Sequence, residues 1–115
     1  MSAPSPPAPF DLTSGPFRLG AAGGGRFTAE GPLVFTSARA ARQLGLEALE
    51  QAPEKRLEMD CQGVTATDSA GLAVLLDWLA VARSHGHSLR YLHLPAGLIA
   101  LARISEVNEM LERGV

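Results

Sequence analysis

The chain is poor in aromatic residues and in cysteine, and it has no block of charges of one sign. Aromatic side chains make up 5% of its 115 residues, so a core has to be built from Leu, Val and Ala, and the length fits one small domain. The single cysteine, Cys61, excludes an intrachain disulfide and favours a reducing compartment. A net charge of -2 without a basic stretch argues against a nucleic-acid partner.

Long hydrophobic runs are also missing. The longest apolar stretch, residues 70–82, contains Asp77 and is too short to cross a bilayer, so we expect no insertion into a membrane. The N-terminal segment lacks the positively charged and apolar regions of a secretory signal. Together these absences predict a cytoplasmic protein.

Patterns typical of catalytic and metal sites are absent as well. Cys61 has no histidine base in its sequence context, so it is expected to be a small buried hydrophobe. Ser69 does not lie in the Gly-x-Ser-x-Gly turn of a serine hydrolase. No cysteine or carboxylate stands at metal-ligand spacing from the histidines, and solvated loop positions are expected for His85, His87 and His93. We therefore expect neither an enzyme nor a cofactor or metal site.

Two parts of the chain differ in composition. Residues 1–16 hold most of the prolines, with Ser and Ala between them, and predict a disordered or extended tail. This tail is expected to act as a spacer or to bind an aromatic groove on a partner. Residues 17–115 are expected to form the folded domain.

Hydrophobic periodicity in the domain predicts the order β-β-α-β-α-β-α-α. The expected elements are strands over 17–21, 26–34, 57–61 and 89–94, and helices over 38–51, 69–85, 95–104 and 105–114. The expected helix-start residues are Thr36 or Ser37, Asp68 or Ser69, Pro95, and Ser105. The two strand–helix–strand units require parallel pairing with right-handed crossovers. The predicted fold is therefore a small α/β domain, with a mixed sheet of about four strands packed with about four helices.

The helix that follows Asp68 is apolar around most of its circumference. One stripe is expected to face the sheet and comprises Leu72, Leu75, Leu76, Leu79 and Ala82. A second stripe consists of Val74, Trp78 and Val81. Either a neighbouring helix covers this second stripe, or it is a docking face anchored by the only tryptophan. The sequence leaves both interpretations open.

The start of this helix places a hydroxyl next to a carboxylate. Ser69 can cap the helix, and its hydroxyl is expected at the positive end of the helix dipole, beside Asp68 and near Asp60. A phosphate would be tolerated there, and it would add about two negative charges at the edge of a docking surface. Ser69 is thus a candidate cap and a candidate phosphoacceptor.

A string of short motifs surrounds Ser69: Met59-Asp60, Gly63-Val64 and Asp68-Ser69-Ala70-Gly71-Leu72. The string resembles that of the STAS family, the sulfate-transporter and anti-sigma-factor-antagonist domain, and the likeness extends over about residues 17–112. The resemblance implies a non-enzymatic switch or adaptor. In the family's bacterial stand-alone members the residue matching Ser69 is phosphorylated by a partner kinase, and the helix that it opens docks onto that partner.

The stretch from Gly31 to Thr36 is similar to the MlaB type of this family. The resemblance implies a cytoplasmic subunit that contacts the ATPase of a phospholipid-transporting ABC system, which maintains outer-membrane lipid asymmetry. Asp68-Ser69 equally fits the alternative, an anti-sigma factor antagonist that binds an anti-sigma factor kinase and is switched by phosphorylation of Ser69. The expected partner-binding residues are Asp68, Ser69, Ala70, Gly71, Val74, Trp78 and Val81.

Overall fold

The computed structural model describes residues 16–113, so the expected tail lies, apart from Pro16, outside the described residues. The order of elements is the expected one. The strands are β1 (Arg18–Gly23), β2 (Arg26–Leu33), β3 (Arg56–Thr67) and β4 (Ser88–Leu92). The helices are α2 (Ala38–Gln51), α3 (Ser69–Ser84), α4 (Ala96–Ile104) and α5 (Asn108–Arg113).

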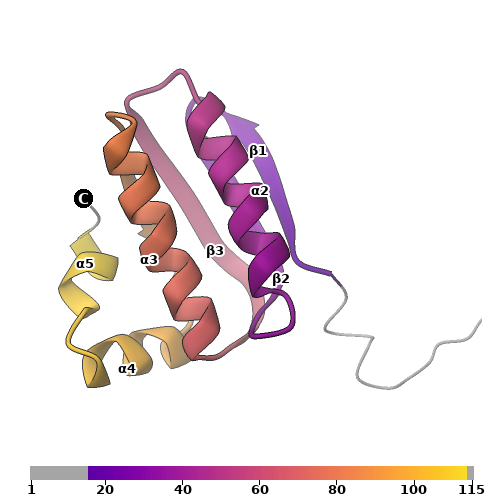
Figure 1. Ribbon diagram of the computed structural model, residues 1–115, viewed down its shortest axis with the longest axis vertical. Helices are drawn as coiled ribbons and strands as arrows, with labels where there is room; N and C mark the ends of the chain where they lie inside the picture. Colours follow the sequence, from indigo (N-terminus) through magenta and orange to yellow (C-terminus); the bar gives the residue numbers. More distant parts are fainter. Residues whose placement is uncertain (1–15, 114–115) are drawn as a thin grey trace, which may run out of the picture.

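The four strands form one mixed sheet in the order β1-β2-β3-β4. β1 pairs with β2 in an antiparallel hairpin, whereas β2, β3 and β4 run parallel. Helices α2 and α3 lie side by side over one face of the sheet, and α4 and α5 lie beyond α3 (Figure 1). The predicted α/β fold with a mixed sheet is confirmed.

The turn of the hairpin depends on three consecutive glycines. Gly23, Gly24 and Gly25 have φ angles of 86°, 64° and 83°, a region in which a side chain would be strained. The turn therefore forms where the sequence predicted it, and it brings the start of β1 next to the end of β2.

Strand alternation places the aliphatic core between the sheet and the helices. On β3, Leu57, Met59 and Cys61 are buried, whereas Glu58 and Asp60 between them are partly exposed. Tyr91 on β4 is buried, and its hydroxyl donates a hydrogen bond of 2.6 Å to the backbone oxygen of Leu75. Side chains from one face of the sheet thus supply one side of a dry core.

β3 is longer than the sequence predicted. The expected strand ended at Cys61, but the observed one continues to Thr67, where Ala66 and Thr67 pair with the end of β2. The last residues of the observed strand, Thr65 to Thr67, include two β-branched side chains that favour extended backbone. Pairing with β2 then extends the strand up to Asp68.

Two helix starts at the C-terminal end also differ from the prediction. Pro95 is the residue before α4 and not part of its first turn. Ser105 ends α4, and α5 begins only at Asn108. The reason is that Glu106 takes a left-handed conformation (φ 62°), and the Val107 N–H bonds to the Ala102 carbonyl at 2.8 Å. This arrangement closes α4 as a Schellman motif.

Candidate functional site

The N-terminal ends of α2 and α3 meet at one edge of the sheet, because the parallel strands β2 and β3 both end there (Figure 1). Asp68 links the two ends through its carboxylate. Its Oδ2 accepts a hydrogen bond of 2.9 Å from the backbone N–H of Phe35, in the β2–α2 connection. Its Oδ1 accepts one of 3.1 Å from the backbone N–H of Gly71, in the first turn of α3. Asp68 therefore caps α3 and holds the connection against it.

The β2–α2 connection is fastened a second time by Ser37. This residue is the N-cap of α2, as the sequence allowed, but its side chain makes no capping bond to the helix. Its hydroxyl donates to the Pro32 carbonyl at 2.7 Å and accepts from the Val34 N–H at 3.0 Å. The backbone on either side of Phe35 is thus held in place.

The prediction that Ser69 caps α3 is wrong. Asp68 has the extended backbone of an N-cap, and Ser69 is the first residue of the helix itself. Within the described residues the Ser69 side chain is exposed and makes no hydrogen bond. Asp68 takes the capping role because a carboxylate has enough acceptors to serve α3 and the Phe35 N–H together. The Ser69 hydroxyl is left free at the surface.

We predict that Asp68→Ala lowers the free energy of unfolding by about 1–2 kcal/mol, the usual cost of losing a helix cap. Ser69→Ala is the matched control, since it removes a neighbouring polar side chain that bonds to nothing described, and a change within about 0.5 kcal/mol is expected. Urea unfolding of the two variants measures both values. If Ser69→Ala is the more destabilising, the assignment of the cap to Asp68 is incorrect.

Gly71 lets the start of α3 pack against β2. It is buried, and a methyl group at this position would collide with the carbonyl oxygen of Leu33 at the end of β2. The absent side chain lets the start of α3 approach the backbone of β2 closely. Gly71 therefore has a packing role, and its contact with a partner stays a prediction.

The second apolar stripe of α3 is covered by α2. Trp78 is 0% exposed, and its indole N–H lies 3.3 Å from the backbone oxygen of Arg42, to which it donates. A side chain at Gly45 of α2 would collide with the indole. Val74 is also buried, whereas Val81 is only partly buried and packs against the core. The neighbouring-helix interpretation is therefore correct for Trp78, whose side chain no partner can reach, whereas partner contact at Val74 and Val81 stays a prediction.

Above the buried stripe, the two helices leave an open groove of about 470 Å³, here called the α2–α3 groove. Its lining consists of Phe35, Ala38, Arg39, Arg42, Ala70, Ala73, Val74 and Asp77. The hollow exists because small alanine side chains face each other across the helix pair. Of the expected partner-binding residues, Ala70 and Val74 line this groove, and Ser69 directly precedes Ala70.

Phe35 is the most notable residue of this groove, because it is a large hydrophobic residue that is 79% exposed. Its backbone is held by Asp68, yet its ring contributes little to the core. Phe35 was not among the predicted partner-binding residues, although an aromatic residue in a polar strand-to-helix connection is a usable signal. Ring and groove together form an apolar patch of the kind that marks protein contacts.

The charges around the groove are only partly neutralised. Arg42 donates to the Asp77 carboxylate across the helix pair, with 2.9 Å between Nε and Oδ2. In the part of the chain that the structure describes, Arg39 has no ion pair. The groove therefore combines an apolar lining with one free positive charge.

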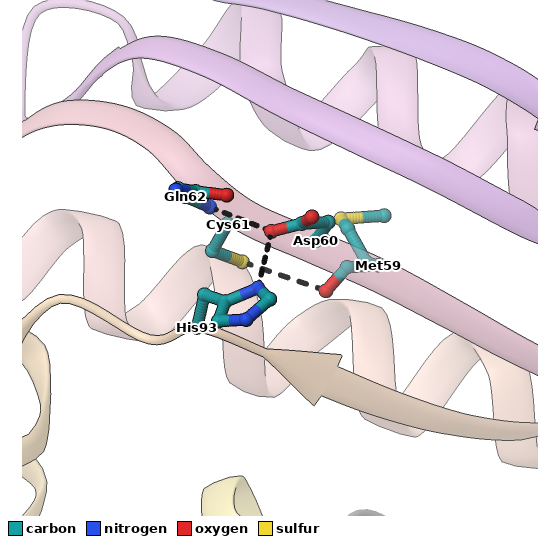
Figure 2. A network of polar contacts seen from close by, with 5 residues as sticks. All are labelled: Met59, Asp60, Cys61, Gln62 and His93. Atoms are coloured by element: carbon teal, nitrogen blue, oxygen red, sulfur yellow. Dashed lines mark hydrogen bonds and ion pairs between the residues drawn. The ribbon is translucent and has the colours of Figure 1, made fainter.

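Asp60 lies far from this site, contrary to expectation. It sits seven residues before the end of β3, about 23 Å along an extended strand. Its Oδ1 accepts from the Gln62 N–H at 2.9 Å and lies 3.0 Å from Nδ1 of His93 (Figure 2). These hydrogen bonds, chiefly the one from Gln62, lower the pKa of Asp60. Asp60 thus belongs to the partly exposed side of the sheet and cannot add charge beside Ser69.

Cys61, next to Asp60 in Figure 2, is fully buried, as expected for a small hydrophobe. Burial raises the pKa of its thiol to about 12. Among residues 16–113, no three His, Cys, Asp or Glu side chains are grouped so that they could hold a metal ion. No helix in the same range is long and apolar enough to span a membrane.

Comparison with known proteins gives two kinds of match. A family model described as "Mlab, STAS domain" matches residues 21–112. The structure is similar to that of the anti-sigma factor antagonist SpoIIAA in its unphosphorylated form, with a TM-score of 0.59 and 13% identity over 76% of this chain and 82% of that one. It is also similar to SLC26A9, with a TM-score of 0.58 and 20% identity over 73% of this chain but 16% of that one. At these identities the two structures show a shared fold only. No curated protein sequence matches.

Proposed function

The chain belongs to the STAS domain family of the MlaB type, and from this premise we propose that it is a non-enzymatic adaptor. Its partner is the ATPase subunit of an ABC transporter that moves phospholipids and maintains outer-membrane lipid asymmetry. The adaptor binds at the cytoplasmic side of the inner membrane, through its partner and without inserting into the bilayer.

The observation that carries the proposal is the exposed ring of Phe35 at the mouth of the α2–α3 groove. A phenylalanine whose ring is mostly exposed contributes little to folding, whereas an aromatic side chain is a frequent anchor at an interface. Ser69 and Ala70 lie at the same end of the helix pair. A partner surface that covers Phe35 would therefore also meet the start of α3.

The surroundings of Ser69 support an adaptor more than an enzyme. A serine nucleophile needs a base within hydrogen-bond reach, but the histidines are engaged elsewhere. His87 lies 2.6 Å from the Glu54 oxygen, His93 bonds to Asp60, and His85 lies 3.0 Å from the Val81 oxygen at the far end of α3. None of the three histidines is therefore in place to activate the Ser69 hydroxyl.

One observation favours a second candidate function, the phosphorylation switch of an anti-sigma factor antagonist. The Ser69 hydroxyl is exposed and unbonded at the first turn of α3, where a kinase can reach it and where the helix dipole tolerates a phosphate. The two functions require different partners. Affinity capture from the native host separates them, since one predicts a transporter ATPase and the other an anti-sigma factor kinase.

The direct test of the adaptor function is binding of the full chain to the purified ATPase, with Phe35→Ala as the diagnostic change. We expect the parent to bind, and the variant to lose about 2 kcal/mol, roughly 30-fold in Kd. Ile104→Ala is the matched control, because Ile104 is 80% exposed at the end of α4, away from the groove. Its affinity should equal that of the parent.

Calorimetry or surface plasmon resonance gives the affinities, and urea midpoints check that both variants remain folded. A parent chain that does not bind the ATPase contradicts the adaptor function. Equal affinities of Phe35→Ala and the parent contradict the placement of the interface at the groove.

A further inference from the structure

We propose that residues 6–12 of this chain, Pro-Pro-Ala-Pro-Phe-Asp-Leu, dock in the α2–α3 groove and occupy it when no partner is bound. The docking is an intramolecular contact, and it does not depend on the function proposed above. Its consequence, competition with the ATPase for the same groove, rests on that function.

The chemistry of the segment complements the groove. Proline-rich segments pack on exposed aromatic rings, and Phe35 presents such a ring at the mouth of the groove. Phe10 and Leu12 provide two apolar side chains for an alanine-walled hollow. Asp11 between them carries the charge opposite to that of Arg39, the cation at the groove with no ion pair among the described residues.

The path of the chain brings the segment to the groove. The Pro16 carbonyl lies so close to Gly31 that a side chain on Gly31 would collide with this carbonyl. The Arg18 guanidinium donates a hydrogen bond of 3.3 Å to the same carbonyl oxygen. The chain before Pro16 therefore starts at the end of β2, beside the connection that holds Phe35. Phe35 follows Gly31 by four residues, at most about 14 Å of chain. In a polyproline II conformation the six residues from Pro16 back to Phe10 span about 19 Å.

Because the segment is covalently linked to the domain, a weak contact is enough to keep it in the groove for part of the time. A short tether gives an effective local concentration in the millimolar range. A segment whose separate affinity is only millimolar is then bound for roughly half of the time. Prolines also lower the ordering cost, because polyproline II is already populated in the free chain.

Paramagnetic relaxation tests the docking in the full-length protein. A nitroxide is attached at Ser5→Cys; native Cys61 stays unlabelled because it is buried and its thiol pKa is raised to about 12. We expect the amide signals of Ala38, Arg39 and Ala73 to lose intensity relative to the reduced nitroxide, and that of Arg90 on β4 to keep it.

A second labelled chain carries Phe10→Ala and Asp11→Lys as well, which remove the apolar and the acidic contact. The three groove signals should then recover, while the matched control Thr13→Ala leaves the loss unchanged. Groove signals without any loss, or a loss that persists in the double variant, overturn the proposal. A loss that arises only between labelled and unlabelled chains in a mixture also overturns it, since the occupant is then a second copy.

The competition has its own readout. If the segment occupies the groove half of the time, the double variant should bind the ATPase about twofold more tightly than the parent; an unchanged affinity refutes competition. The relaxation experiment needs no partner, so its failure leaves ATPase binding intact. Conversely, a chain that does not bind the ATPase can still show the docked segment.

Discussion

Replacing Trp78 with alanine should lower the free energy of unfolding by about 3–5 kcal/mol, the range measured when large buried aromatic side chains are truncated. Its indole is fully buried between α2 and α3, next to Gly45, and its N–H bonds to the Arg42 carbonyl. Phe17 packs on it with ring centroids 6.0 Å apart. The variant leaves a cavity beneath the groove and loses the indole hydrogen bond, and urea unfolding measures the lost stability.

Phe35→Ala is the control for Trp78→Ala, because it truncates another large aromatic residue that is mostly exposed. Its free energy of unfolding should stay within about 0.5 kcal/mol of the parent value. The opposite pattern, in which Trp78→Ala keeps its stability but loses the partner, would restore the docking-face interpretation of the second stripe.

The order of elements could be predicted because its signals are local. Alternating strands, the glycine turn before Arg26 and Gly86 after α3 each act within a few residues of where they stand. Gly86 takes a positive φ of 79°, as a glycine at a helix end does. The end of β3 was not predictable in this way, since pairing with β2 decides it.

The face that α3 presents to solvent could not be predicted, because it depends on another helix. An apolar circumference is compatible with a neighbour and with a partner alike. Gly45 determines that α2 covers the second stripe, because its missing side chain leaves space for Trp78, 33 residues away in the sequence. A glycine within a helix indicates close packing only when the residue that faces it on the neighbouring helix is known.

The position of the cap was ambiguous by one residue for a similar reason. Asp and Ser are about equally good N-caps, so Asp68-Ser69 cannot be resolved from propensity. The Phe35 N–H, 33 residues away, decides in favour of Asp68 because the carboxylate serves both groups. The Ser69 hydroxyl then makes no bond that stabilises the fold, and for this reason we propose that it lies in an interface.

The acidic variants Ser69→Asp and Ser69→Glu should lower the affinity for the ATPase by about 3 kcal/mol, more than 100-fold in Kd. The added carboxylate would be buried without a partner beside Asp68, whose own charge is already used by two backbone N–H groups. Stability should be equal or slightly higher, because an acidic residue in the first turn of a helix interacts favourably with the dipole.

Ala80→Glu is the matched control, since it adds the same charge to an exposed position of α3 that lies outside the groove lining. Ser69→Ala should bind about as well as the parent, because the loss comes from the added charge and not from the missing hydroxyl. Titration calorimetry of the variants against the ATPase measures the differences. If the acidic variants bind as tightly as the parent, Ser69 lies outside the interface, and a phosphate at this position could not act as a switch.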